Sequence, residues 1–207
     1  MSGLNKIVFA CSFGSEVGFG HVGRCASIAQ IATQRGVETI LWSDSDVGML
    51  PPEMRNSFQK FAVGSWKEGS WPKEVVCSDC FVIDDMDSPD GDFDRFRRRM
   101  LEQKSKALLL AVDDMRQRRL GSADIVLNQE IGLRKADYSC RGDALLGVEY
   151  ALLRSGLGRP SRVEWKGADN TIPVFIMIGG TDVHRLTPHV LDGLIEMKDR
   201  KISPVIV

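Results

Sequence analysis

The chain has 207 residues, a net charge of −1, and 43% hydrophobic and 27% charged residues. That composition is ordinary for a folded domain, and the length suits one large domain or one domain with part of another. A nearly neutral charge argues against nucleic acid or an anionic membrane as the main partner. The sequence has no apolar run near the roughly 20 residues that cross a bilayer, and its first residues do not resemble a signal peptide. We therefore expect a cytoplasmic protein without a membrane segment.

Apolar runs and helical patterns alternate along the first three quarters of the chain. We predict strands at 6–13, 37–42, 81–83, 107–112 and 125–127, and helices at 22–35, 52–60 and 92–104. Several of these strands are apolar on both faces, which is typical of a parallel sheet covered by helices on both sides. The predicted fold class is α/β, with a Rossmann-like domain at 1–154.

The composition changes after residue 154. Residues 155–170 have the composition of a linker, and 171–207 contain one apolar strand at 172–178, a helix at 186–198 and the start of a strand at 205–207. Two strands and one helix cannot bury a core of their own. We expect this part to be the beginning of a truncated second domain, or to pack on a partner chain that docks along the strand at 205–207.

A glycine-rich turn links the first strand to the first helix. Gly18, Gly20 and Gly23 surround His21 there. Glycine lets the backbone turn sharply and approach a ligand closely, and the start of a helix attracts anions such as phosphate. The same partial positive charge would keep His21 neutral and usable as a base. The alternative is a tight turn with a histidine that faces solvent.

Two predicted strands end in pairs of aspartates, Asp84 with Asp85 and Asp113 with Asp114. In open parallel sheets, ligands bind beyond the carboxyl ends of the strands. These carboxylates therefore belong at the same edge as His21. The alternative is that each aspartate caps the helix or loop that follows it.

The cysteines and basic clusters indicate no further site. Five cysteines without framework spacing fit free thiols, and Cys77 and Cys80 lack the second ligand pair that zinc requires. We expect Cys25 to lie in the core rather than act as a nucleophile, since nothing lowers its pKa. The arginine clusters at 95–99 and 116–119 are interpreted as solvated faces. No metal and no cofactor are predicted.

Five blocks in order resemble the UDP-sugar hydrolases of the pseudaminic acid pathway, which remove UDP from a 2,4-diacetamido-2,4,6-trideoxy-altrose donor. The spore-coat polysaccharide proteins and, more distantly, GT-B glycosyltransferases of the peptidoglycan type are similar to these. The blocks are 17–25, 82–84, 112–114 with 125–129 downstream, 145–154, and 178–182 leading into 186–187. The resemblance implies a GT-B-like architecture with two Rossmann-like domains.

The resemblance also implies a mechanism and a set of site residues. A histidine after the glycine turn, here His21, would act as general base on a water that attacks the anomeric carbon, so that UDP leaves with inversion. The substrate-binding residues implied are Gly18, Gly20, Asp84, Asn128 and Gln129 in the first domain, and Gly179, Gly180 and Thr181 near the diphosphate. UDP-sugar is then the small-molecule partner.

The chain departs from the family at two places. Ala10 and Ser12 stand where an arginine and an aspartate are usual, and Asp85-Met86 replaces a histidine and a tyrosine. Three interpretations therefore stay open: a hydrolase with a changed sugar, a glycosyltransferase-like protein, and a non-catalytic or partner-dependent relative. A small polar pocket would favour hydrolysis, and a cleft lined by apolar residues would favour transfer to an acceptor.

Overall fold

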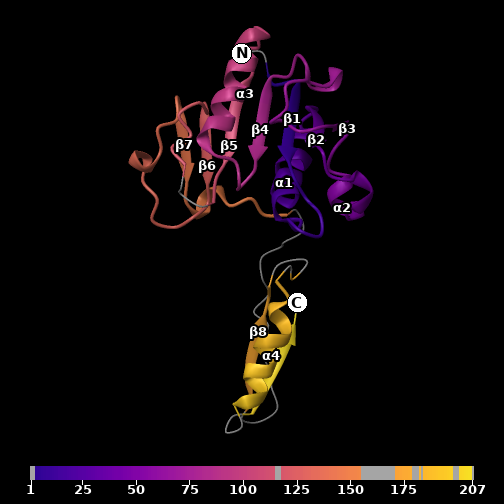
Figure 1. Cartoon of the computed structure of the whole chain (residues 1–207), viewed down its shortest axis with the longest axis vertical. Coiled ribbons are helices and arrows are strands. Elements are labelled where there is room, and N and C mark those ends of the chain that lie inside the picture. The colour runs from indigo at the N-terminus through magenta and orange to yellow at the C-terminus, as the bar shows by residue number, and fades with distance from the viewer. Residues whose placement is uncertain are drawn as a thin grey trace.

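The computed structural model describes residues 3–114, 118–154, 171–178, 182, 184–197 and 201–206. Seven strands of the first part form one parallel sheet, in the order β3-β2-β1-β4-β5-β6-β7, and lie side by side in Figure 1. The strands are β1 Lys6–Cys11, β2 Glu38–Ser43, β3 Lys60–Val63, β4 Cys80–Asp84, β5 Leu108–Val112, β6 Ile125–Asn128 and β7 Asp143–Leu146. The predicted α/β class with a Rossmann-like sheet is confirmed.

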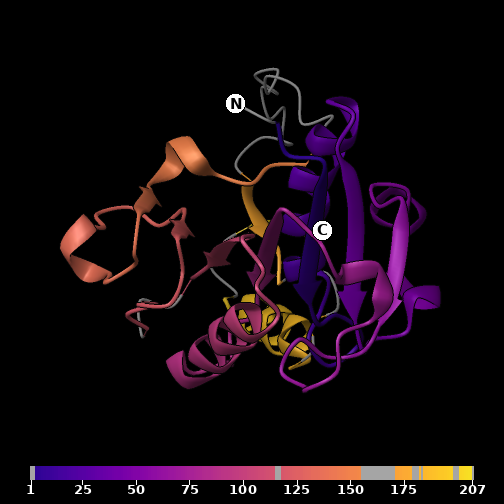
Figure 2. The same cartoon turned by 90° about the horizontal axis from the view of Figure 1, so that it is seen from above.

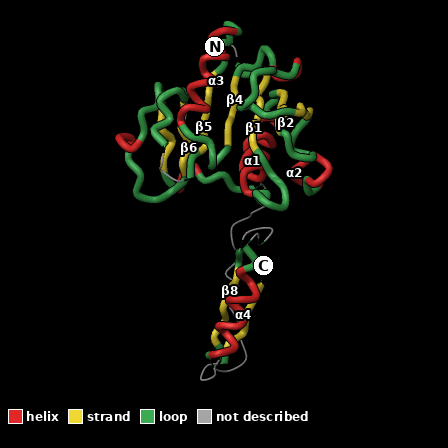
Figure 3. The backbone as a smooth tube through the Cα atoms, in the orientation of Figure 1, coloured by secondary structure: helices red, strands yellow, loops and turns green. Residues whose placement is uncertain are grey.

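Three α-helices accompany this sheet in the described residues: α1 Gly20–Gln34, α2 Pro52–Arg55 and α3 Asp90–Glu102. Figure 3 distinguishes them from the strands by colour. Short 3-10 turns lie at Val47–Met49 (η1), Lys73–Val75 (η2), Lys135–Asp137 (η3) and Val148–Tyr150 (η4). The helix predicted at 22–35 begins two residues earlier than expected, at Gly20, so His21 lies on the helix itself.

The strand order contains a reversal of direction. The chain starts at β1, moves outward through β2 to β3, and returns to β4 on the other side of β1. Beyond this point it proceeds outward again to β7. Figure 2 shows the sheet from above, with the β3 and β7 ends on opposite sides. In such sheets the crevice at the carboxyl ends of β1 and β4 is the usual ligand site.

Each face of the sheet packs against its own core, because successive side chains of a strand point to opposite faces. On one face, Phe81 and Ile83 of β4 pack with Phe93, Phe96 and Met100 of α3. The other face joins Cys80 and Val82 of β4 to the buried side of α1, which includes Val22, Cys25, Ala26 and Ala29. The small residues on α1 bring that helix close to the sheet.

Two elements differ from the sequence prediction. The helix predicted at 52–60 ends at Arg55, and Lys60–Val63 forms the edge strand β3 instead. The second edge strand, β7 at Asp143–Leu146, was not predicted. Both are edge strands of four residues that begin with a charged residue, so each has only three consecutive apolar residues to indicate a strand.

The last part of the chain contains β8 Ile172–Ile176, α4 Leu186–Glu196 and β9 Ile202–Ile206. β8 and β9 pair in parallel as a separate two-stranded sheet. Asp182 accepts hydrogen bonds from the backbone N–H groups of Leu186 (2.7 Å) and Thr187 (3.0 Å) at the start of α4. The predicted linker at 155–170 lies outside the described residues. In the described part of the chain, no helix is both long and apolar enough to cross a membrane.

Candidate functional site

Three elements converge at the crevice between β1 and β4. His21 and Arg24 come from the first turns of α1, and Asp84 is the last residue of β4. Asp114 follows the carboxyl end of β5. The sequence placed His21, Asp84 and Asp114 at this edge, and the structure brings them together through Arg24.

Asp84 is the centre of the cluster and is almost completely buried, with 1% of its surface exposed. Its Oδ1 atom lies 2.7 Å from His21 Nδ1 and 2.8 Å from Arg24 Nη2. Its Oδ2 accepts a second bond from Arg24 Nε at 2.8 Å. Arg24 thus donates two parallel hydrogen bonds to Asp84, which is the strong bidentate geometry of arginine and carboxylate. Its third nitrogen, Nη1, pairs with Asp114 Oδ2 at 2.5 Å.

These contacts determine which nitrogen of His21 carries the proton. Nδ1 lies 2.7 Å from the carboxylate of Asp84 and 2.9 Å from Arg24 Nη2. A guanidinium only donates and an ionised carboxylate only accepts, so Nδ1 can satisfy only one of them. We assign an N–H on Nδ1 that donates to Asp84, because this contact is shorter and Arg24 Nη2 already has Asp84 as its acceptor. In neutral His21, the lone pair then belongs to Nε2.

The pKa of His21 is raised above its ordinary value, chiefly by the hydrogen bond to Asp84, while burial and the charge of Arg24 oppose the rise. The expectation that the helix N-terminus would hold His21 neutral is therefore wrong in direction. The carboxylate 2.7 Å away outweighs the diffuse partial charge of the helix. His21 accepts a proton more readily than an ordinary histidine.

The remaining member of each acidic pair, Asp85 and Asp113, lies on the other face of the sheet. Asp85 accepts a hydrogen bond from Trp66 Nε1 (3.2 Å) and pairs with Lys67 (3.0 Å). Asp113 pairs with Arg118 (2.6 Å) and accepts a bond from the Tyr138 hydroxyl (2.6 Å). These two aspartates stabilise the fold rather than the site. The prediction of a solvated arginine cluster at 116–119 is wrong for Arg118, which is buried.

Asn128 and Gln129, which the resemblance placed at the sugar, have structural contacts here. Asn128 is fully buried; its amide nitrogen donates to the Tyr138 hydroxyl (2.8 Å) and its oxygen accepts the Glu130 N–H (2.9 Å). Gln129 Oε1 accepts the backbone N–H of Leu152 at 3.1 Å. Gln129 therefore holds the segment at Leu152 in place, two residues before Arg154. Arg154 lines a pocket beside α1.

The glycine turn before α1 is a small closed loop. Gly14 and Gly18 bond each other through both backbone groups (3.1 and 2.7 Å), and Gly18 has a φ of 81°, which favours glycine. Gly20 begins the helix, with open space around the position of a Cβ. The predicted site residues Gly179, Gly180 and Thr181 lie outside the described residues.

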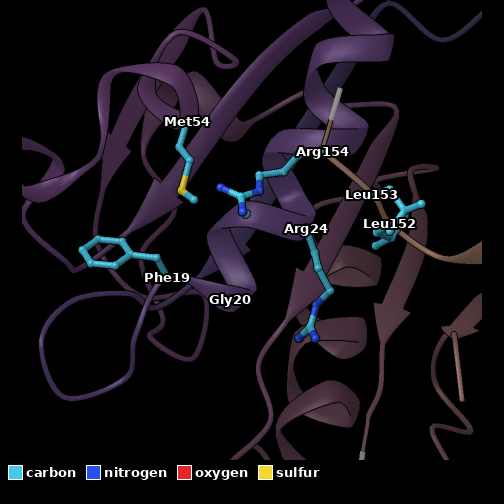
Figure 4. Close-up of a pocket in the computed structure, with 8 residues that line it drawn as sticks. Phe19, Gly20, Arg24, Met54, Leu152, Leu153 and Arg154 are labelled. Atoms are coloured by element: carbon cyan, nitrogen blue, oxygen red, sulfur yellow. The ribbon is translucent and has the colours of Figure 1, made fainter. Parts of the chain in front are cut away.

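A pocket of about 340 Å³ lies beside the start of α1 (Figure 4). Its walls come from the start of α1, from α2 and from the segment after β7: Phe19, Gly20, Gly23, Arg24, Met54, Leu152, Leu153 and Arg154. The pocket shares Gly20 and Arg24 with the turns that carry His21. It combines apolar walls with two arginines, so it is neither a small polar site nor a purely apolar cleft.

The cysteines behave as the sequence predicts for thiols without a catalytic role. Cys25 is fully buried, and a contact with Cys11 together with burial raises its pKa well above the ordinary value. Burial also raises the pKa of Cys80 to about 12. Cys77 is exposed, and all five cysteines are free. Within the described ranges, no group of three or more histidine, cysteine or acidic side chains is arranged to hold a metal ion.

One contributor to the site, Arg24, was not among the predicted site residues, although it belongs to the block at 17–25. Arg24 lies three residues after His21, and this spacing places two side chains on the same helix face. That signal was available, although the acidic partners could not be chosen without the fold. Outside the site, Tyr138, which bonds both Asp113 and Asn128, had no sequence signal because it comes from a loop.

No protein-family model and no curated protein matches this chain. Two solved structures resemble part of it, both short-chain dehydrogenases/reductases from Veillonella parvula DSM 2008. One, of the wide type and in complex with NADP, has a TM-score of 0.38 and 11% identity over 55% of this chain and 49% of that chain. The other, described as ethylated, has a TM-score of 0.39 and 15% identity over 59% and 51%. The matched part is about half the length of each, and likeness at this level carries no argument about activity.

Proposed function

We propose that this chain hydrolyses a nucleotide-linked sugar with His21 as the general base. The observation that supports this most directly is the contact of His21 Nδ1 with the buried carboxylate of Asp84 at 2.7 Å. A carboxylate on one nitrogen of an imidazole fixes its tautomer and orientation, and leaves the other nitrogen to accept a proton. The position of the pair, at the reversal point of the sheet, is where α/β folds bind ligands.

In the proposed reaction, His21 Nε2 takes a proton from water while the water oxygen attacks the anomeric carbon. The bond between that carbon and the phosphate oxygen breaks, and UDP leaves with the bonding electrons. Water must approach from the face opposite the leaving group, so the free sugar has inverted configuration. The proposed substrate class is a UDP-linked 2,4-diacetamido-2,4,6-trideoxy sugar, which rests on the resemblance of the sequence blocks to the pseudaminic acid pathway hydrolases.

The test is UDP release from a panel of such sugars by the wild-type chain and by His21→Asn. Removal of a general base lowers the rate by about 10²–10⁴. His189→Asn is the matched control, because this histidine is exposed and its Nδ1 contacts the backbone oxygen of Arg185, the N-cap of α4 (3.0 Å). Proton NMR of the released sugar reports its configuration. Equal rates for wild type and His21→Asn would refute the proposed role of His21.

Transfer of the sugar to an acceptor is a second candidate, favoured by the apolar walls of the pocket beside α1. Phe19, Met54 and Leu153 line this pocket, which also includes Gly20, the residue before His21. A transferase releases UDP faster when its acceptor is present, whereas a hydrolase needs only water. UDP release that stays constant across a panel of amphipathic alcohols would exclude this candidate for that panel.

A further inference from the structure

The pocket beside α1 has walls of two kinds. Phe19, Met54, Leu152 and Leu153 contribute apolar side chains, and the volume of about 340 Å³ is within the range of small-molecule sites. Among the described residues that line it, the charged groups are the guanidinium groups of Arg24 and Arg154. Such a cavity offers burial for an apolar body and positive charge for one end of it.

The two arginines are in different electrostatic states. The guanidinium of Arg24 is already neutralised by Asp84 and Asp114. Among the described residues, no carboxylate pairs with Arg154, although Glu53 lines an adjoining cavity that Arg154 also reaches. In Figure 4 the Arg154 side chain extends across the pocket toward Met54, whereas Arg24 extends away from it. Arg154 is thus the cation that a ligand in this pocket would meet.

The helix start adds to this positive character. The N-cap residue of α1, Phe19, offers no side-chain bond to the helix, and the first turn of α1 has no acidic residue. The first backbone N–H groups of a helix have no partner within the helix and attract anions. Gly20 leaves open space beside them, because nothing lies within 4 Å of a Cβ built there. The helix start and Arg154 therefore both favour an anion at this pocket.

The segment that bears Arg154 is held in place before any ligand arrives. Leu152 donates its backbone N–H to Gln129 Oε1 at 3.1 Å, and its side chain packs against the core on the α1 face. Ala151 bonds back to Val148 at 3.1 Å. A cation on an anchored segment loses less freedom on binding than one on an unattached loop.

We propose that this pocket binds an organic anion, with its phosphate or carboxylate head on Arg154 and its apolar or ring portion against Phe19 and Met54. The proposal goes beyond the proposed hydrolysis and does not depend on it. The ligand defined by these contacts has one oxyanion head and an apolar body. Phosphate esters and carboxylates share that chemistry.

Isothermal titration calorimetry at low salt, with the full chain, tests this proposal. Phenyl phosphate and benzoate carry both parts of the ligand, and they distinguish a phosphate head from a carboxylate head. Inorganic phosphate carries only the charge, and phenol only the ring. None of these probes contains a glycosidic bond, so the result is independent of whether the chain turns over a UDP-sugar.

Arg154→Gln removes the cation from the pocket, and Arg35→Gln removes the same charge from the exposed C-terminal end of α1. We expect Arg154→Gln to weaken binding of the better probe by roughly tenfold or more, since bonds to charged groups are the strong ones, and Arg35→Gln to leave it unchanged. Leu153→Ala shortens an exposed wall side chain. It should weaken phenyl phosphate or benzoate several-fold without changing inorganic phosphate.

Three results would overturn the proposal in a chain that circular dichroism shows to be folded. The first is no measurable heat with either phenyl phosphate or benzoate at millimolar concentration. The second is an equal loss of affinity in Arg154→Gln and Arg35→Gln, which would indicate nonspecific charge attraction. The third is inorganic phosphate binding as tightly as phenyl phosphate, which would remove the role of the apolar walls.

Discussion

The hydrogen bond to Asp84 raises the pKa of His21 and the charge of Arg24 opposes this rise, so Arg24→Gln measures the opposing effect. In the native site, Arg24 bonds Asp84 twice and lies 2.9 Å from His21 Nδ1. The charge of Arg24 lowers the pKa of His21, whereas Asp84 and Asp114 raise it. Glutamine removes the opposing charge and leaves both carboxylates. We expect the pKa of His21 to rise further.

The size of this effect follows from the distances. Two unit charges about 4 Å apart interact by about 4 kcal/mol at an effective dielectric constant of 20. That energy corresponds to about a thousandfold change in an acid dissociation constant. The side chains of His21 and Arg24 are 12% and 17% exposed, and water will enter the space that Arg24 leaves. We therefore expect the acid dissociation constant of His21 to fall by roughly tenfold.

The assay is an NMR titration of the histidine ring protons, which needs no substrate. The chain has three histidines, His21, His184 and His189, so the spectrum is simple, and His21→Asn assigns the resonance. Arg35→Gln is the control for loss of one positive charge. A pKa of His21 in folded Arg24→Gln equal to or below that of the wild type would refute this account of the site.

The raised pKa of His21 also predicts how the stability of the fold depends on pH. The pKa of His21 in the folded state is raised above its unfolded value of about 6.5, so the native state binds this proton more tightly than the unfolded state does. This stabilisation is fully present below about pH 6.5 and is lost as the pH rises through the folded pKa. If His21 is the base in hydrolysis, the acid limb of the rate profile follows the same raised pKa, and Arg24→Gln moves it to higher pH.

Three further predictions concern the fold. Tyr138→Phe removes the hydroxyl that bonds Asp113 and Asn128, and should lower the free energy of unfolding by about 1–3 kcal/mol in urea titrations; an unchanged midpoint would contradict the buried network. Phe96→Ala removes a fully buried ring and should cost about 3–5 kcal/mol, with a loss below 1 kcal/mol counting against the packing described. Thiol labelling of the native protein should modify exposed Cys77 first and buried Cys25 only on unfolding, and mass spectrometry showing the reverse order would contradict the burial.

The central strands could be predicted because their sequences are apolar on both faces. Predicted 81–83 and 107–112 correspond to β4 and β5 within one or two residues. The edge strands could not be predicted in the same way. Lys60–Val63 and β7 are each four residues long with a charged first residue, which is too short a run for hydrophobic periodicity to identify.

The sequence also placed the right chemical groups at the right edge, yet could not say which aspartate serves the site. Asp84 and Asp85 are adjacent and chemically identical, and only the register of β4 decides that Asp84 points to the α1 face. Asn128 shows a second limit of the sequence. The resemblance assigned it to a sugar, but a polar side chain at a strand end can be occupied entirely by a buried network.

The alternation of the acidic pairs across the sheet has a consequence for how such chains diverge. Asp84 and Asp114 meet Arg24 beside α1, whereas Asp85 and Asp113 meet the groups on the α3 face. A change at Asp85 or Asp113 therefore alters the packing beneath α3 and leaves the partners of His21 in place. A change at Asp84 does both kinds of damage, because it removes the partner of His21 and leaves the guanidinium of Arg24 without its buried carboxylate.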